Sequence, residues 1–429
     1  MKWITPILAL AIGIAAMVIP AAEPPQPDPQ PGTVLPPVAV CPTEEGATRS
    51  GRLNIVSTVA GTGQITIFSG GGSAGSGTFD TGGSGSASVA VGDIAAVGSA
   101  AALVEFPVSA SATASVTTGT GVISAETCSG IPDSQVIVGG GSTINDIPFR
   151  LQLMNPYSAP ATVDITAFSE SGRESNDALR SIIVPASSSV VVDIGSILSG
   201  RATLNLIVEA TRGSVVTSAS TEVGGDQAIW RAVAPAQTWY VPLPVFNGTR
   251  EVVIASSTPN EVAYQIDVFG PGGLEEPAIE GTVEGGGQET INLSEIGPAA
   301  LAVRVVTSAP VGVFAKLTAE GALGIAAGSP LPTNDWLVPG AGSGEAIAGR
   351  LVLVNTGIEA TEVTVTEVRE MSRSRIIQVL PGEVVEIELD SVDSDGVSIT
   401  SDGEIVPFWI ARSGPAVAVS GGFPLQANE

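Results

Sequence analysis

The sequence contains no histidine, only two lysines, two cysteines and 4% aromatic residues. Without histidine, the chain cannot build a Ser-His-Asp or Cys-His nucleophile system or an HExxH zinc site. A Walker loop is also absent. The glycine-rich stretch at residues 70–77 lies between expected strands, with no helix after it to bind a phosphate. We therefore expect no cofactor and no enzymatic activity based on these chemistries.

Positive charge is also scarce, and the formal net charge is −26. An acidic surface repels nucleic-acid phosphates and anionic lipid headgroups, which argues against both as partners. Solubility of a long exposed protein explains the same charge.

Outside the N-terminus, no window shows the i, i+3, i+4, i+7 apolar stripe of an amphipathic helix. Short alternating runs rich in Val, Ile and Thr are separated instead by glycine and proline, a pattern typical of strands and turns. The pattern predicts an all-β protein.

One stretch returns four times. It begins with Arg, continues as an apolar strand and ends in a small residue. The copies are Arg52-Leu-Asn-Ile-Val-Ser57, Arg150-Leu-Gln-Leu-Met-Asn155, Arg250-Glu-Val-Val-Ile-Ala255-Ser and Arg350-Leu-Val-Leu-Val-Asn355. The spacing of roughly 100 residues suggests one compact domain per copy.

Seven or eight short strands per repeat predict four tandem immunoglobulin-like β-sandwich repeats after an N-terminal hydrophobic helix. The alternative is a β-propeller with two blades per repeat. The expected segments are a signal peptide or membrane anchor (1–22), a proline-rich linker (23–37) and four β repeats (38–134, 135–237, 238–334, 335–429).

Residues 1–22 carry Lys2 followed by an apolar run that fits either a cleaved signal peptide or an uncleaved anchor. Either one exports the rest of the chain, and an anchor would make the membrane a partner. The proline-rich linker would then hold the first repeat away from the membrane.

Cys41 lies in the opening strand of the first repeat, and Cys128 lies near its last strand. We expect them to form a disulfide, which is consistent with an extracytoplasmic location.

Three further patterns are candidate sites. Asp390, Asp393 and Asp395 are a weak calcium candidate, although an acidic hairpin loop is the favoured interpretation because the EF-hand spacing is missing. Arg369, Arg373 and Arg375 form the one basic patch expected on the acidic protein, and partners could contact it.

Trp239 and Trp336 lie one repeat apart at the repeat starts, where they could stack on sugars or pack at a seam between repeats. The four repeat-phased arginines, Arg52, Arg150, Arg250 and Arg350, could bind an anion. Their recurrence favours ion pairs within or between domains.

Together, the W-x-V-P strand, the L-x-L-x-N-P/T strand, the V-P-x-x-S/G-x-V hairpin and the small terminal strands resemble an uncharacterised family of exported actinobacterial proteins. The resemblance implies an N-terminal membrane segment, a proline-rich spacer and β repeats. It supplies no functional residues.

The sequence therefore favours a non-enzymatic scaffold or adhesion-type protein of the bacterial cell envelope, with an envelope protein as partner. The alternative is an accessory protein that binds carbohydrate or a cell-wall polymer. A carboxylate-dependent glycosidase is the least favoured reading, because it needs two acids converging in one cleft.

Overall fold

Strands make up nearly all of the regular structure in the computed structural model. The described residues are 38–44, 49–106, 110–118, 121–130, 133–296, 299, 301–340, 348–368, 373–389, 396–414 and 416–425. The predicted all-β class is confirmed. The signal or anchor segment at 1–22 and the linker at 23–37 lie outside these residues. Where the structure describes the chain, it contains no helix long and apolar enough to span a bilayer.

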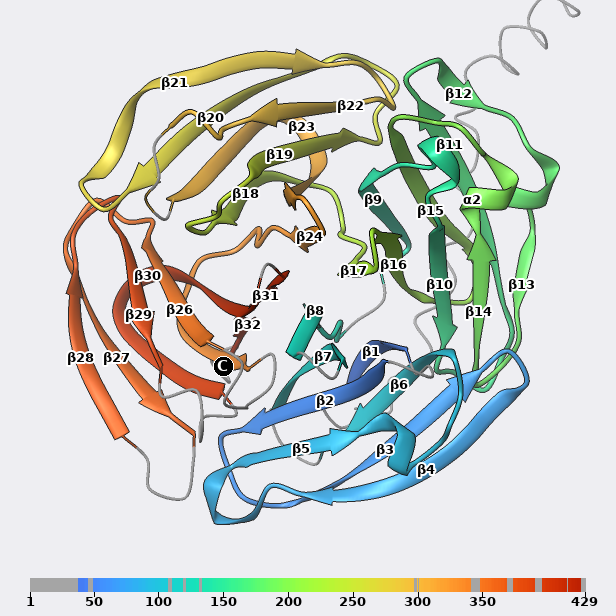
Figure 1. Cartoon of the computed structure of the whole chain (residues 1–429), viewed down its shortest axis with the longest axis horizontal. Coiled ribbons are helices and arrows are strands. Elements are labelled where there is room, and N and C mark those ends of the chain that lie inside the picture. The colour runs from blue at the N-terminus through green and yellow to red at the C-terminus, as the bar shows by residue number, and fades with distance from the viewer. Residues whose placement is uncertain are drawn as a thin grey trace, which may run out of the picture. The chain divides into compact units, whose positions relative to one another are not determined.

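The strands follow the fourfold repeat (Figure 1). The first repeat contains β1 (Val38–Glu44), β2 (Ser50–Ser57), β3 (Thr62–Ser69), β4 (Gly72–Asp80), β5 (Ser86–Ala90), β6 (Ser99–Glu105), β7 (Ala110–Thr118) and β8 (Gly121–Thr127). The second contains β9 (Gln135–Gly141), β10 (Phe149–Asn155), β11 (Ala161–Ser169), β12 (Gly172–Glu174), β13 (Ile182–Val184), β14 (Ser188–Asp193), β15 (Leu204–Arg212), β16 (Val216–Val223) and β17 (Asp226–Arg231).

The third repeat contains β18 (Ala236–Leu243), β19 (Thr249–Ser256), β20 (Val262–Gly270), β21 (Gly273–Val283), β22 (Gln288–Asn292), β23 (Leu301–Ala319) and β24 (Ala322–Ala327). The fourth contains β25 (Thr333–Pro339), β26 (Ala348–Asn355), β27 (Thr361–Glu367), β28 (Arg373–Val379), β29 (Val384–Glu388), β30 (Gly396–Ser413), β31 (Ala416–Gly421) and β32 (Phe423–Pro424). The helical segments are single turns: η1 (Gly82–Ser84), η2 (Val91–Asp93), η3 (Ile144–Asp146), η4 (Asp177–Leu179) and α2 (Ile194–Ile197).

Each repeat consists of antiparallel sheets around an apolar interior. In the first repeat the sheet orders are β1-β6-β3-β4 and β5-β2-β7-β8, and both sheets contribute to one core cluster. The sandwich prediction is confirmed. The propeller alternative required blades built from consecutive strands, and the described sheets are instead open, with crossed-over strand order.

One long strand spans the closing part of the third repeat. Strand β23 runs unbroken from Leu301 to Ala319. Its first half pairs with β18 and β20, and its second half pairs with β19 and β24. In the second repeat, Gly213 adopts a φ of 70° between β15 and β16 and interrupts the corresponding passage.

The small polar residue that ends the repeated stretch closes the next turn. Asn155 and Asn355 each accept a hydrogen bond from the backbone N–H two residues later, at 3.0 and 2.9 Å. Ser57 and Ser256 accept the equivalent bond at 3.3 and 3.2 Å. The recurrence of this residue in the sequence therefore reflects a side-chain–backbone turn.

We expect Asn355→Ala to lower the free energy of unfolding by about 3 kcal/mol, because its buried amide also donates to two carbonyls. These are the carbonyls of Glu359 and Val379, at 2.8 and 2.9 Å. Urea unfolding measures the change. Asn355→Ser is the matched control, because serine occupies this position in two repeats and keeps the acceptor, so it should cost less. Equal losses for the two variants would contradict this account.

Neighbouring repeats pack through one recurring contact. An apolar residue at the end of the third long strand of one repeat meets the next repeat: Phe68 packs with Met154, and Phe269 lies in one cluster with Val354. A side chain at Gly286 would collide with the ring of Phe168. The glycine is therefore required by the close approach of the second and third repeats.

The fourth repeat meets the first through the same kind of contact. Val368, the counterpart of those phenylalanines, clusters with Val56 and Leu337. The Thr113 hydroxyl of the first repeat donates to the carbonyl of Pro339 at 3.3 Å. The repeats therefore contact one another in a cycle, in which the last repeat rests on the first.

Candidate functional site

The closing strands of the four repeats meet one another. Strand β8 contacts both β17 and β31, and β24 contacts the same two strands. Hydrogen bonds tie them together: the Ser124 hydroxyl accepts from the N–H of Ile229 at 2.8 Å, and the Thr127 hydroxyl donates to the carbonyl of Gly421 at 2.5 Å. We call the space at the ends of these strands the axial cavity.

The axial cavity has a volume of about 270 Å³. All four repeats line it, through Thr127, Cys128, Ser129, Gly130, Asp133, Val136, Val215, Val216, Thr217, Arg231, Ala232, Val233, Ala234, Trp239, Ser329, Pro330, Leu331, Gly422, Phe423 and Pro424. Most of these are small or apolar, and the charged members are Asp133 and Arg231. The volume lies near the lower end of the range for small-molecule sites, ~300–1,000 Å³.

Arg231 connects the cavity to a buried carboxylate. Its Nε lies 3.6 Å from Oε1 of Glu126, whose side chain is 2% exposed. The same carboxylate accepts from the backbone N–H of Thr127 at 2.8 Å and of Arg231 at 3.1 Å. Arg231 also donates through Nη2 to the carbonyl of Gly328 at 3.2 Å. The ion pair therefore joins the first two repeats, and the hydrogen bond to Gly328 connects Arg231 to the third.

Burial dominates the electrostatics of this pair. It raises the pKa of Glu126 to about 7, against the opposing effects of Arg231 and of backbone N–H donors, which favour the charged form. Burial likewise raises the pKa of Asp133 at the cavity wall.

The raised pKa of Glu126 predicts a pH dependence of stability. The folded state holds this proton up to a pH of about 7, whereas the unfolded chain loses it near 4.5, so stability should fall as the pH rises between these values. The loss amounts to about 3 kcal/mol relative to Glu126→Gln, which does not titrate. Urea unfolding of both proteins at pH 4.5 and 7.5 measures it. Glu209→Gln, on an exposed carboxylate, is the control, and an equal pH slope in wild type and Glu126→Gln would contradict the assignment.

Among the described residues that line the cavity, Asp133 is the one with a carboxyl group, and glycosidic cleavage needs two carboxyl groups that flank the bond. Arg231 supplies a guanidinium for an anionic or hydroxyl-rich group, and the apolar walls suit a small ring.

Both predicted contact tryptophans are buried. Trp239 is 1% exposed and lines the axial cavity, and its Nε1 donates to the carbonyls of Ala236 and Val311 at 3.0 and 2.9 Å. Trp336 is 0% exposed, and its Nε1 donates to the carbonyl of Thr333 at 3.0 Å. These positions favour the packing interpretation over sugar stacking.

The predicted basic patch is described only in part. Arg373 and Arg375 lie on β28, and Arg375 pairs with the buried carboxylate of Glu367 at 3.1 Å. Arg369 and the calcium candidates Asp390, Asp393 and Asp395 lie outside the described residues. Within the described ranges, no three acidic, cysteine or histidine side chains gather as a metal site would require.

The disulfide prediction is confirmed. Cys41 and Cys128 are bonded, with a Cα–Cα distance of 4.5 Å across a sequence separation of 87 residues. The bond ties β1 to the residue after β8, next to the axial cavity.

The repeat-phased arginines have local partners where the structure gives them. Arg350 pairs with Glu386 and Glu388 at 2.6 and 3.0 Å. Arg52 donates to the Ser88 hydroxyl at 2.9 Å, and Arg250 donates to the carbonyl of Ala299 at 2.8 Å. Arg150 borders a small cavity beside β1 and β16. Arg350 therefore forms the expected ion pair within its own repeat. Arg52 and Arg250 also contact residues of their own repeats, through hydrogen bonds.

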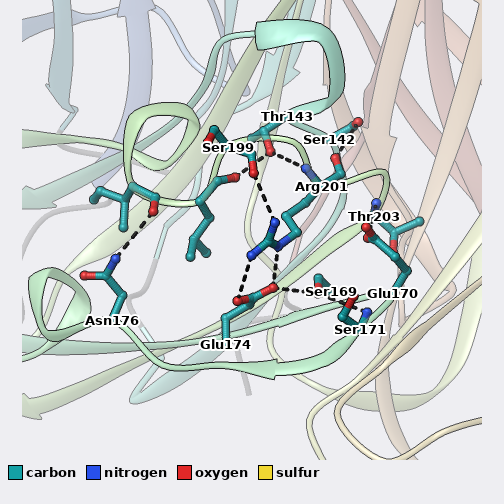
Figure 2. A network of polar contacts seen from close by, with 12 residues as sticks. Ser142, Thr143, Ser169, Glu170, Ser171, Glu174, Asn176, Ser199, Arg201 and Thr203 are labelled. Atoms are coloured by element: carbon teal, nitrogen blue, oxygen red, sulfur yellow. Dashed lines mark hydrogen bonds and ion pairs between the residues drawn. The ribbon is translucent and has the colours of Figure 1, made fainter.

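A second polar cluster lies in the second repeat (Figure 2). Arg201 donates hydrogen bonds to the carboxylate of Glu174 through Nε and Nη2, and its Nη1 donates to the carbonyl of Ser199 at 3.1 Å. The Ser169 hydroxyl donates to Glu174 at 2.7 Å. The hydrogen bond and charge of Arg201 lower the pKa of Glu174. These hydrogen bonds connect β12 to the segment before β15, so we interpret this cluster as structural.

Sequence reasoning missed Glu126 and Arg231. Their signal was present: they are charged residues in short closing strands. Arg231 pairs with Ser218 across the closing hairpin of the second repeat. At the equivalent positions, the third repeat pairs Ala327 with Phe314 and the fourth pairs Gly421 with Phe408.

The sheets and the shared cavity define an all-β protein whose sandwich repeats pack against one another. A family model matches residues 81–324, and the chain belongs to that family, DUF5719, a family of unknown function. No curated protein matches the chain.

Three solved structures show faint similarity. A red sea bream transglutaminase is 13% identical with a TM-score of 0.11, over 44% of this chain and 31% of its own. A tetra-tandem repeat from the extending region of a large adhesion protein is 14% identical with a TM-score of 0.12, over 91% and 100%. A Salmonella alpha-2-macroglobulin mutant is 11% identical with a TM-score of 0.12, over 91% and 29%. The chain thus spans about a third of the transglutaminase, and at these scores none of the three supports an argument.

Proposed function

We propose that the protein is a non-enzymatic scaffold or adhesion-type protein of the bacterial cell envelope, acting outside the cytoplasm. The observation that carries the proposal is the recurring junction: each repeat packs on the next, and the fourth packs on the first. A frame of this kind holds its loops in fixed positions, where partners can be engaged. The Cys41–Cys128 disulfide is the usual chemistry of an oxidising compartment.

The test is photo-crosslinking of the full chain in its native cells. The turn after the repeated stretch exposes Ile358 to 94%, so a photoreactive amino acid placed there reports what this end of the fourth repeat contacts. We expect discrete crosslinks to an envelope protein or glycan. The same probe at Leu353, which is 0% exposed, should give none. Turnover of an envelope polymer by the purified chain, lost in Asp133→Asn, would show that it is an enzyme instead.

The second candidate is binding of a carbohydrate or cell-wall polymer in the axial cavity. The cavity favours it, because the partly exposed Phe423 and the buried Trp239 form its walls beside Arg231 and Asp133. A pull-down with isolated cell walls tests it. Phe423→Ala should weaken binding about tenfold, since one aromatic contact contributes on this scale. Tyr157→Ala, at a partly exposed aromatic residue that does not line the cavity, should leave binding unchanged, and undiminished binding by Phe423→Ala would remove this candidate.

A further inference from the structure

Each repeat has an edge strand that pairs with its third long strand (Figure 1). In the order of the repeats, these edge strands are β4, the short pair β12 and β13, β21, and β28. A sheet edge presents backbone N–H and C=O groups that can pair with a strand from another molecule. Natural proteins usually block such edges, so an edge that is left open is a candidate docking surface.

Three of the four edges carry features that hinder pairing. Strand β4 contains Gly72, Gly75 and Gly77, and its register shifts against β3. Strands β12 and β13 have only three residues each. Strand β21 contains Pro277, which has no backbone N–H, and its register shifts against β20. Glycines, short strands, prolines and bulges all make an edge a poor template for a further strand.

Strand β28 has none of these features. It extends over seven residues without glycine or proline, and its register against β27 is continuous. Ile376 is 68% exposed on this strand, and Leu380, directly after it, is 55% exposed. Among the described residues, β27 is the one strand that pairs with β28. The fourth repeat therefore keeps a regular and partly apolar edge.

Hydrogen bonds on the far side of β27 show which of its backbone groups reach β28. The N–H of Glu362 donates to Asp402 at 2.8 Å, and the N–H of Val368 donates to the carbonyl of Gly396 at 2.9 Å. Both acceptors belong to β30. Because backbone groups alternate in direction along a strand, the odd-numbered residues of β27, such as Val365, direct theirs toward β28.

The same alternation gives the direction of the backbone groups on β28. Val365 lies opposite Arg375, so Arg375 directs its N–H and C=O groups toward β27. Ser374, Ile376 and Gln378 therefore direct theirs away from β27. The described part of the chain provides no second strand to pair with these groups.

Charge limits which strand can pair with β28. Arg373 and Arg375 are its only charged residues, and Arg375 pairs with Glu367 but remains 41% exposed. Across a strand pair, opposite charges stabilise and like charges destabilise. A second copy of β28 would add two further arginines, whereas a strand with acidic residues would complement those present. The net charge of −26 opposes an acidic partner mainly at long range, where salt screens charges more than roughly 8 Å apart.

We propose that β28 is the docking edge for an extended segment of a partner protein in which acidic and apolar residues alternate. The segment adds one strand to the sheet by bonding to the backbone of Ser374, Ile376 and Gln378. Its acidic side chains lie on the face of Arg373 and Arg375, and its apolar side chains lie on the face of Ile376. This inference rests on the scaffold function proposed above and names the kind of partner that the scaffold engages.

Fluorescence anisotropy of the full chain with a labelled peptide tests the proposal at physiological ionic strength. The peptide alternates glutamate and valine and is as long as β28. We expect a dissociation constant of about 0.1 mM, and no binding of the same peptide with lysine in place of glutamate. No saturable binding at about 1 mM protein, or equal binding of the two peptides, would overturn the proposal.

Proline variants test whether the peptide binds to the backbone. Ile376→Pro removes an N–H that faces away from β27, so it should weaken binding at least tenfold and leave the thermal midpoint unchanged. Ile376→Ala is the matched control, because it keeps this N–H and should weaken binding less. Gln378→Pro makes the same test at a second position should Ile376→Pro fail to fold. Undiminished binding by the folded proline variants, or equal losses for Ile376→Ala and Ile376→Pro, would contradict strand addition.

Sedimentation velocity separates a partner strand from a second copy of this chain. We expect a monomer with and without Ile376→Pro. A dimer that Ile376→Pro dissociates would mean that β28 pairs with another copy, and the acidic partner would be abandoned. Failure of the peptide to bind leaves the crosslinks expected at Ile358 unaffected, so this inference and the proposed function can fail separately.

Discussion

Glu126→Leu is expected to lower the free energy of unfolding by about 3–5 kcal/mol, the usual cost of removing one partner of a buried ion pair. The variant leaves the guanidinium of Arg231 without its carboxylate, 26% exposed among apolar neighbours. It also strands the backbone N–H groups of Thr127 and Arg231, which donate to the carboxylate. Urea unfolding at pH 7.5 measures the loss.

The double variant Glu126→Leu/Arg231→Leu separates charge from packing. Apolar side chains often replace a buried ion pair at little cost, so the double variant should recover part of the stability that the single variant loses. If Glu126→Leu cost less than about 1 kcal/mol, the carboxylate would not hold the repeats together.

The second large effect concerns the disulfide. Cys41→Ala/Cys128→Ala should lower the free energy of unfolding by about 4–5 kcal/mol, because the bond closes a long loop and restricts the unfolded chain. The separation is 87 residues, and both sulfur positions are buried, at 0% and 4% exposure. Alanine keeps the site apolar, so the loss reports mainly the missing crosslink.

The measurement is urea unfolding of the oxidised wild type, the reduced wild type and the double variant. The reduced protein and the double variant should agree closely, since both lack the same crosslink. A variant as stable as the oxidised protein would mean that β1 and the end of β8 are held in place by other contacts, such as the backbone bonds between Val40 and Ser129.

Local patterns predicted the architecture of this protein well. The alternating runs of Val, Ile and Thr predicted strands correctly: along β27, Val363 and Val365 are buried, while Glu362 is exposed. The residue that ends each repeated stretch stood out in the sequence, and its role in the turn is local. The two cysteines were paired correctly because their positions at both ends of one repeat left a single simple solution.

Contacts between repeats could not be predicted in the same way. The axial cavity depends on how four closing strands approach one another, and a sequence period carries no information on that distance. Glu126 lies in an otherwise small and apolar strand, and its significance emerges only beside Arg231, 105 residues later in the chain. Strand β23 likewise stays extended through Pro310, although proline usually marks an interruption in a strand.

The contact between the fourth repeat and the first has a consequence for the order of the chain. Because Val368 meets Val56 much as Phe68 meets Met154, packing does not dictate which repeat must come first. A circularly permuted gene that starts at the second repeat, with a flexible linker joining the old ends, should therefore still encode the native arrangement.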